Sequence, residues 1–300
     1  MLLALSLTVF PISGRGGMAA GHASKSTAAA MDHSATPAAS PHVHEDMADA
    51  GHSMKRRLHL VVPCFRESAR LPRFLPQLCA EMDEIAGVSV LVVDDGSGDS
   101  EAAATRKIVE DLRGRHACLL PLLELPQNLG KGGAVYAGWA AHEGAEWLGF
   151  VDADGSCGAL EAARLARMAM TDCASPSALF ASRVKMLGRR VERLFKRHLL
   201  GRVYATLVSE LLRIPVYDSQ CGLKLVPRAA YEKAAGHLHV HGFAFDVELM
   251  AALLDTGCPV VEAPIDWRET PGGKVSLLRD SWRMALDVWR IRRRRANGWK

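Results

Sequence analysis

Short apolar runs alternate with longer segments of helical spacing along most of the chain. Four runs are predicted to be strands, at residues 58–63, 88–93, 119–125 and 147–151. The first two (LHLVVP and VSVLVV) are almost entirely apolar, which is typical of strands that are buried on both faces. Three segments have the apolar spacing of helices, at residues 68–85, 99–113 and 132–144. Strands that alternate with helices predict an α/β fold with a mostly parallel central sheet flanked by helices.

Polar residues follow each of these four strands. The clusters are Arg66-Glu67, Asp94-Asp95, Asn128 to Gly133, and Asp152 with Asp154. Ligands of parallel α/β sheets sit beyond the carboxyl ends of the strands. Four polar strand ends in a row therefore predict one shared site, and this coincidence carries more weight than any of the motifs alone.

Asp152 and Asp154 are the central candidates. Residues two apart in an extended segment point to the same side, so both carboxylates can converge on one hard cation. Mg²⁺ or Mn²⁺ takes oxygen ligands and commonly bridges a carboxylate to substrate phosphates, where it assists the departure of a diphosphate as a Lewis acid. An isolated Asp-x-Asp is usually a solvated turn, but its place at the end of an apolar strand favours a metal site.

Two glycine-containing loops add to the predicted site. Asp94 and Asp95 precede Gly96, which permits a tight turn. Their carboxylates suit a ribose or a base edge, and the alternative is a plain turn before a helix that Asp99 caps. Residues 128–133 (NLGKGG) run into a helix N-terminus, which suits an anion. This loop matches neither the dinucleotide fingerprint nor the phosphate-binding loop of nucleotide hydrolases.

The motifs together resemble those of a known enzyme family. Three segments are similar to the opening, nucleoside-binding and metal motifs of the inverting family 2 glycosyltransferases, whose nucleotide-diphospho-sugar transferase fold is called GT-A. These are VVPCFRES at 61–68, VLVVDDGSGD at 90–99 and VDADGS at 151–156. The second half is similar to the dolichyl-phosphate β-glucosyltransferases, among the polyprenyl-phosphate glycosyltransferases. Its matching segments are Ser182-Arg183, 218–225, 238–249 and 273–275. The resemblance spans roughly residues 57–299.

This resemblance implies which residues bind the nucleotide sugar. The nucleoside would be cradled by Pro63, Phe65, Glu67, Asp94 and Asp95. Asp152 and Asp154 would hold Mg²⁺ or Mn²⁺ on the diphosphate. Lys131, Ala153 and Lys274 would complete the donor site, with Lys274 closing over the diphosphate.

Two residues depart from the family pattern. Phe65 replaces a tyrosine, which costs little because the ring that stacks on a base is kept. Arg66 replaces an asparagine, and the sequence offers no explanation for this change.

The implied catalytic residues are Asp154, Arg183 and Asp218, with Asp218 as the family's carboxylate beside the acceptor. A phosphate monoester is largely ionised near neutral pH, so it can attack the anomeric carbon without a strong general base. Catalysis then depends on positioning and on charge stabilisation. Arg183 would contact phosphate. The arginines that either help to hold the acceptor or line a solvated helix face are Arg189, Arg190 and Arg193.

We expect an inverting hexosyltransferase that moves glucose from UDP-glucose to a polyprenyl or dolichyl phosphate. Residues 220–222 (QCG) and 245–248 (FDVE) favour this branch over the alternative, a polyprenyl-phosphate mannosyltransferase that uses GDP-mannose. A non-catalytic sugar-nucleotide binding protein is the alternative from another class. The presence of Asp152, Asp154 and Asp218 argues against it. No nucleic-acid partner is expected.

Positive charge is concentrated in two stretches. The chain has 37 Lys and Arg against 33 Asp and Glu. Residues 279–300 hold eight cationic residues against two aspartates, and residues 183–202 hold eight against one glutamate. Such clusters favour an anionic partner, here an acidic membrane surface. We expect membrane-surface helices over about 190–213 and 276–295, the second a basic amphipathic helix with tryptophans. For the first, packing on the protein's own core is the alternative.

Residues 1–53 differ from the rest and hold five of the twelve histidines. We expect a disordered tail of low complexity, followed by a single GT-A domain over residues 54–300. Met54, directly before the first strand, is an alternative start that would remove the tail from the natural protein. Seven cysteines without a CxxC pair favour a reducing cytoplasm. A secreted metal-binding protein, suggested by the tail histidines alone, clashes with the need for cytosolic nucleotide sugar. We therefore expect a peripheral protein on the cytoplasmic face of the membrane.

Overall fold

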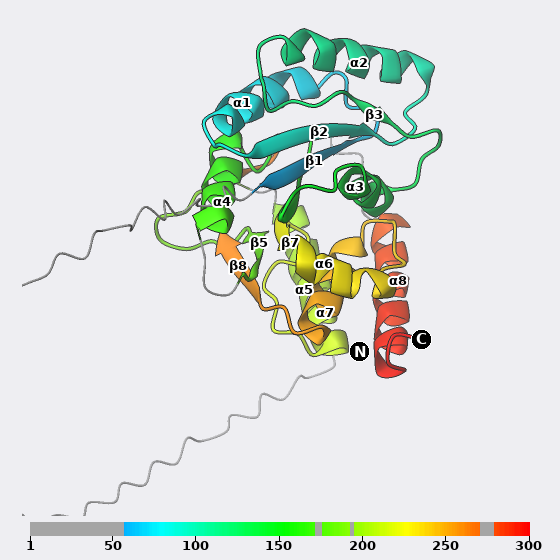
Figure 1. The fold of residues 1–300 in the computed structure, drawn as a ribbon. Helices are drawn as coiled ribbons and strands as arrows, with labels where there is room; N and C mark the ends of the chain where they lie inside the picture. Colours follow the sequence, from blue (N-terminus) through cyan, green and yellow to red (C-terminus); the bar gives the residue numbers. More distant parts are fainter. Residues whose placement is uncertain (1–56, 172–175, 193–194, 271–278) are drawn as a thin grey trace, which may run out of the picture. The chain divides into compact units, whose positions relative to one another are not determined.

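The computed structural model describes residues 57–171, 176–192, 195–270 and 279–300. The predictions for residues 1–53, for Arg193 and for Lys274 lie outside these ranges. Within them, a central sheet carries helices on both faces (Figure 1).

The central sheet has seven strands in the order β3-β2-β1-β4-β7-β5-β8. They are β1 (Leu58–Cys64), β2 (Val88–Asp94), β3 (Leu123–Glu124), β4 (Trp147–Val151), β5 (Ala178–Ser182), β7 (Leu223–Pro227) and β8 (Val260–Pro264). β7 is antiparallel to both of its neighbours, and the other pairs are parallel. A separate ladder pairs β6 (Val191–Glu192) with β9 (Trp267–Arg268). The prediction of a mostly parallel sheet is confirmed.

Helices cover the sheet in two groups. The helices on one face are α1 (Leu71–Asp83), α2 (Asp99–Arg113) and α4 (Ala159–Thr171). The helices on the other are α3 (Lys131–Ala140), α5 (Phe195–Leu212), α6 (Arg228–Ala234), α7 (Phe245–Asp255) and α8 (Arg279–Ala296). A short 3-10 helix, η1 (Ala235–His237), follows α6. The predicted α1, α2 and α3 match the observed helices to within four residues at each end.

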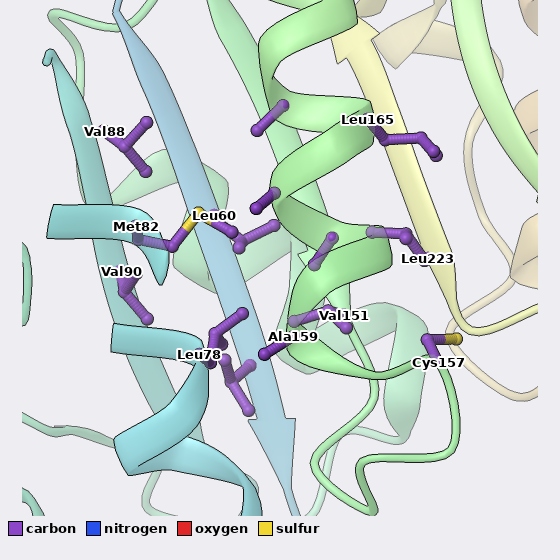
Figure 2. Close-up of a cluster of buried hydrophobic side chains, with 14 of the residues drawn as sticks. Leu60, Leu78, Met82, Val88, Val90, Val151, Cys157, Ala159, Leu165 and Leu223 are labelled. Atoms are coloured by element: carbon purple, nitrogen blue, oxygen red, sulfur yellow. The ribbon is translucent and has the colours of Figure 1, made fainter. Parts of the chain in front are cut away.

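The two hydrophobic cores follow from the alternation of side chains along the strands, because successive residues of a strand point to opposite faces. Leu60 of β1 enters the core beneath α1 and α4, whereas Val61 enters the core beneath α3. Figure 2 shows the first core, in which Leu60 and Val90 face Leu78 and Met82 of α1. The apolar strands are thus buried on both faces, as their composition predicts.

The third strand is shorter than its apolar run predicts. The pattern indicates a strand over 119–125, whereas β3 has two residues and an isolated bridge joins Leu119 to Val90. Pro121 lies between the bridge and β3. It has no N–H to donate, so it interrupts the ladder at this edge of the sheet.

The two helices expected at a membrane surface each bury one side. On α5, Tyr204, Val208 and Leu212 are buried in the second core, while Val203 is exposed. One apolar row of this helix therefore packs on the protein itself, which is the alternative that the sequence left open.

α8 buries Val288 and Ile291 completely, whereas Trp282, Leu286 and Trp289 on its other side are exposed. More than half of the surface of each of its two tryptophans is therefore open. Among the residues described, no helix is both long and apolar enough to cross a bilayer.

Two arginines of α8 face the domain and do not add to an outward cationic surface. Arg294 is ion-paired with Glu248 of α7, which is fully buried. Arg295 forms a bidentate pair with Asp255, with N–O distances of 2.6 and 2.7 Å. Glu248 also accepts two backbone N–H groups from residues 239–240. These bonds tie the last helix to α7 and to the loop before it.

The pH dependence of folding tests the surroundings of His59, a fully buried residue of β1. Its Nε2 lies 3.1 Å from the carbonyl of Gly138 and its Nδ1 lies 2.9 Å from the hydroxyl of Ser89. Burial, helped by nearby His142, lowers the pKa of His59 to about 4. Because the unfolded chain then takes up a proton before the folded one, stability is full above about pH 6.5 and falls between pH 6.5 and about 4.

We expect His59 to account for a loss of about 1 kcal/mol in the free energy of unfolding between pH 7 and pH 5.5. Urea unfolding of the wild type and of His59→Gln at both pH values measures it. The glutamine can still donate to Gly138 but does not titrate, so its loss should be smaller by about this amount. The same loss in both proteins would contradict the assignment.

Candidate active site

A cavity of about 600 Å³ lies at the carboxyl ends of β1, β2 and β4. The predicted site residues that line it are Pro63, Phe65, Glu67, Asp95, Lys131, Asp152, Ala153, Asp154 and Arg183. The structure therefore brings most of the predicted site together. Helices from the second half of the chain also border the cavity, through Gly201 and Tyr204 of α5 and Met284 of α8.

Asp152 and Asp154 follow β4 directly. The backbone N–H of Asp152 donates to the carbonyl of Gly222 at 2.8 Å. A Cβ at residue 222 would come within 2.0 Å of Asp152 Oδ2, so this close approach requires glycine. Asp154 Oδ1 accepts the backbone N–H of Ser156 at 2.9 Å. The backbone of Asp152 and the carboxylate of Asp154 are thus each held by a backbone hydrogen bond.

These two carboxylates suit a hard divalent cation. Burial raises the pKa of Asp154, and the charge of Asp152 raises it further, so a positive charge beside both would stabilise their ionised forms. Both offer oxygen, which Mg²⁺ and Mn²⁺ prefer. In the part of the chain that the structure describes, no cluster of three His, Cys, Asp or Glu side chains could hold a metal. Phosphate oxygens and water would therefore complete the coordination.

Lys131, the first residue of α3, places a positive charge next to this pair. Its Nζ lies 2.7 Å from Asp152 Oδ1. The same ammonium lies 5.1 and 5.8 Å from the ring centres of Phe150 and Phe245. Burial lowers the pKa of Lys131, but the charges of Asp152 and Asp246 raise it more, so the net direction is upward. Asp152 is therefore paired with a stable cation.

The glycine loop before α3 binds a carboxylate of the protein itself. The backbone N–H groups of Leu129 and Gly130 donate to the two oxygens of Asp95, at 2.6 and 3.0 Å. The N–H of Gly132 donates to the carbonyl of His241 at 2.8 Å. The sequence suggests that these donors suit a ligand anion, but in the structure the protein already uses them. Burial raises the pKa of Asp95 to about 6, although the two hydrogen bonds lower it.

Asp94 is buried and keeps one oxygen without a partner. Its Oδ1 accepts the N–H of Ser97 at 2.9 Å, and its Oδ2 has no hydrogen-bond partner among the described residues. Between these residues, Gly96 has a φ of +63°, and a Cβ there would lie 2.4 Å from the backbone of Gln127. The predicted tight turn is confirmed. Unlike Asp95, Asp94 does not line the cavity, so the structure does not bring this predicted site residue to its wall.

Arg183 and Asp218 form a bidentate ion pair. The Arg183 Nε and Nη2 atoms lie 2.6 and 2.7 Å from the two Asp218 oxygens, and the Arg183 backbone N–H also donates to Asp218 at 2.9 Å. Burial lowers the pKa of Arg183, but Asp218 raises it more. Asp218 lines a small hollow beside the main cavity, which Arg183 also borders. Because the pair is nearly buried and bidentate, Asp218 fixes the direction of the guanidinium.

Glu262 of β8 holds this pair in place and is a residue that the sequence motifs do not single out. Its Oε1 accepts the N–H of Asp218 at 2.8 Å and the hydroxyl of Ser182 at 3.0 Å. Its Oε2 accepts the N–H of Tyr217 at 2.8 Å. A lone acid within the run VVEAP (260–264) is its sequence signal.

Lys224 and Asp246 form a second pair that the motifs alone do not reveal. Both side chains are almost completely buried, with the Lys224 Nζ 3.0 Å from Asp246 Oδ1 and 2.7 Å from the carbonyl of Cys221. Lys224 lies over the same Phe150 ring as Lys131. The signal for it is a lysine in the middle of the apolar strand LKLVP, because a buried ammonium requires a partner.

The segment after β1 is fixed by local contacts. Glu67 accepts two bonds from the guanidinium of Arg70, one of them at 2.6 Å. Arg66 has a φ of +56°, in the left-handed region, and its guanidinium lies 5.0 Å from the centre of the Phe65 ring. Asparagine adopts this backbone region more readily than arginine. This gives a physical reason for the asparagine of the family pattern.

Similar solved structures identify the fold of this chain. The glucosyl-3-phosphoglycerate synthase from Mycobacterium tuberculosis, in complex with Mg²⁺ and UDP, is similar over 80% of this chain and 80% of its own. The TM-score is 0.58 and the sequence identity 15%. The same enzyme is also known in complex with Mn²⁺, UDP and glucosyl-3-phosphoglycerate. The fold is that of the GT-A nucleotide-sugar transferases.

Sequence comparison assigns the chain within that class. The profile of Glycosyl transferase family 2 matches residues 59–233. The dolichyl-phosphate beta-glucosyltransferase of Saccharomyces cerevisiae is 31% identical over 247 residues, which cover 78% of this chain and 74% of the relative. The enzyme of that name from Dictyostelium discoideum is 31% identical over 258 residues, with coverages of 81% and 76%. The chain therefore belongs to glycosyl transferase family 2. It is a glycosyltransferase, as its motifs predict.

Arg66→Asn is expected to raise the free energy of unfolding by about 1 kcal/mol, because the new residue tolerates the left-handed backbone. Urea unfolding of the variant and the wild type measures the change. Arg66→Ala is the control, since it removes the guanidinium and keeps the unfavourable φ, and it should give no gain. A gain with alanine, or none with asparagine, would show that the backbone is not strained here.

Proposed function

We propose that this glycosyltransferase moves glucose from UDP-glucose onto a polyprenyl phosphate such as dolichyl phosphate, with inversion at the anomeric carbon. One observation carries the proposal. The carboxylates of Asp152 and Asp154 line the same cavity as Arg183, so a donor diphosphate and an acceptor phosphate have charged partners in one place. The names of the two relatives support the sugar and the acceptor, and the UDP complex supports a uridine nucleotide.

The donor would lie across the ends of β1, β2 and β4. We assign to it Pro63, Phe65, Glu67, Asp94, Asp95, Lys131, Ala153 and Lys274. Asp152 and Asp154 would hold Mg²⁺ or Mn²⁺, which, when bound, neutralises charge on the departing diphosphate.

The acceptor phosphate would attack in a single displacement. One of its oxygens forms a bond to the anomeric carbon, the bond from that carbon to the diphosphate breaks, and the nucleoside diphosphate leaves with the electron pair. The attacking phosphate is already ionised near neutral pH, so no proton has to be removed. Asp218 is paired with Arg183, and we therefore give it the role of positioning Arg183 toward the acceptor and not that of a base.

A donor screen tests the proposal. The full chain is incubated with a polyprenyl phosphate, Mg²⁺ and either UDP-glucose or GDP-mannose, and the lipid-linked product is measured. Glucosyl lipid from UDP-glucose is expected. Mannosyl lipid from GDP-mannose alone would move the enzyme to the mannosyl branch, and donor binding without any product would indicate a binding protein.

Asp152→Asn and Asp154→Asn are each expected to lower the rate of transfer at least 100-fold, about 2.7 kcal/mol of activation free energy, because an amide is a poor ligand for a divalent cation. Asp154→Asn should not lower the melting temperature, since burial and Asp152 already disfavour its charge. Asp111→Asn, on the exposed side of α2, is the control. Normal transfer by either site variant, or by the wild type in EDTA, would refute the metal assignment.

We also propose that the enzyme is peripheral on the cytoplasmic face of the membrane, with α8 as its main contact. Trp282, Leu286 and Trp289 form an exposed apolar side, and exposed arginines flank it. Tryptophans beside cationic residues are suited to the interface of an acidic bilayer. Met284 of the same helix lines the cavity, which would keep a lipid headgroup near the donor.

The double substitution Trp282→Ser and Trp289→Ser is expected to weaken binding to vesicles of anionic lipid roughly tenfold, because two large interfacial side chains are lost. Co-sedimentation measures it, beside titration with UDP, whose affinity should stay unchanged. Leu160→Ser, at an exposed site on α4, is the control. Point substitutions are preferred to truncation because Val288, Ile291 and Arg294 hold α8 to the domain. Equal losses in both assays would contradict the membrane role.

A further inference from the structure

We propose that Lys131 is a built-in counter-ion of Asp152 that makes binding of the divalent metal depend on the nucleotide diphosphate. The inference rests on the proposed function, because it takes Asp152 and Asp154 as the metal ligands. The proposed function already gives Lys131 a contact with the donor. The inference adds a second role, in which Lys131 sets the order in which metal and donor bind.

The geometry places Lys131 in competition with a metal. Its Nζ lies 2.7 Å from Asp152 Oδ1, and the two side chains are 17% and 32% exposed, so water screens the pair weakly. The other oxygen of Asp152, Oδ2, packs against Gly222, where a Cβ would come within 2.0 Å. A cation that binds Asp152 through Oδ1 therefore has to displace or share the ammonium, and one that binds through Oδ2 meets the positive charge of Lys131 on the same carboxylate.

Lys131 is held at this place from several sides. The start of α3 is fixed by the bond from the Gly132 N–H to the carbonyl of His241. The ammonium lies over the rings of Phe150 and Phe245, a contact that favours a cation. The neighbouring carboxylate of Asp246 already has Lys224 at 3.0 Å. Asp246 therefore does not draw Lys131 away from Asp152.

The balance of charge explains why tight binding of the metal requires the donor. Asp152 and Asp154 carry two negative charges, and Lys131 cancels one of them. Arg70 and Arg183, the other cations on the cavity wall, are bound to Glu67 and Asp218, so these two pairs change the balance little. A divalent cation alone meets one net negative charge, whereas a nucleotide diphosphate adds further anionic oxygens. The ammonium displaced from Asp152 can then bind one of these oxygens. Metal and donor strengthen each other's binding by the same factor, as linkage requires.

Calorimetric titration of the full chain with Mn²⁺, alone and with saturating UDP, tests the proposal. For the wild type we expect weak binding of Mn²⁺ that UDP strengthens at least tenfold. Lys131→Met keeps a long unbranched side chain without the charge. It should bind Mn²⁺ alone about tenfold more tightly than the wild type, about 1.4 kcal/mol, and should lose most of the response to UDP.

Two further variants make the test specific. Lys131→Arg keeps the positive charge and should behave as the wild type. Lys107→Met removes one exposed charge from α2, and it should leave the affinity for Mn²⁺ unchanged. If Lys131→Met does not fold, Lys131→Gln replaces it with the same expectation, since glutamine can still donate a hydrogen bond to Asp152.

The outcomes separate this inference from the proposed function. Unchanged affinity for Mn²⁺ in the folded neutral variant overturns the role of Lys131, and so does a wild type whose affinity for Mn²⁺ ignores UDP. If both ligands bind the wild type and the substitution has no effect, the donor site stands and the counter-ion role alone fails. If the wild type binds neither Mn²⁺ nor UDP, the donor site itself is wrong and both proposals fall.

Discussion

The close contact between Asp152 and Gly222 joins the two halves of the chain at the site. β4 ends the first series of parallel strands, and β7 pairs with it in the opposite direction. The N–H of Asp152 bonds to the carbonyl of Gly222, and the space beside the carboxylate has no room for a Cβ. Most of the proposed donor residues follow β1, β2 and β4, while the Arg183–Asp218 pair comes from the end of β5 and the turn before β7. Any side chain at residue 222 would push these two groups apart.

Five of the ion pairs join charged side chains at the cavity wall or elsewhere in the described domain. Lys131 pairs with Asp152, Lys224 with Asp246, Arg183 with Asp218, Arg70 with Glu67, and Arg294 with Glu248. Burying an unpaired charge is costly, and removing one partner of a buried pair typically destabilises a protein by roughly 3–5 kcal/mol. Among the described residues, the cavity wall therefore carries no large excess of positive charge.

The sequence predicts the first half of the fold and the position of Asp152 and Asp154 at the cavity well, because both depend on local patterns. Apolar runs mark the strands, and the two-residue spacing of Asp152 and Asp154 puts both on one side. The partner of a buried charge is not a local property. The lysine inside LKLVP shows that Lys224 needs a carboxylate, but only the fold identifies Asp246. For the same reason the sequence motifs indicate separate roles for Arg183 and Asp218, although the two residues form one ion pair.

Tertiary packing also explains the other differences between the predicted and the observed structure. Apolar content alone predicts a strand over 119–125, and Pro121 with its place at the sheet edge shortens it. The arginines near the end of α8 look equivalent in sequence, yet Arg294 and Arg295 face two acids of α7, Glu248 and Asp255. Which side of an amphipathic helix meets the core depends on what it packs against.

A series of hydrogen bonds connects Arg294 of α8 to the start of α3, beside the proposed donor site. Arg294 bonds Glu248, Glu248 holds the backbone of residues 239–240, and the carbonyl of His241 holds Gly132 at the start of α3. The last helix thus helps to hold the glycine loop in place and cannot be removed without affecting that loop. A chimera that exchanges α8 for the anchor of another transferase needs a cation at the position of Arg294. Exchange of this helix would therefore also affect the proposed donor site.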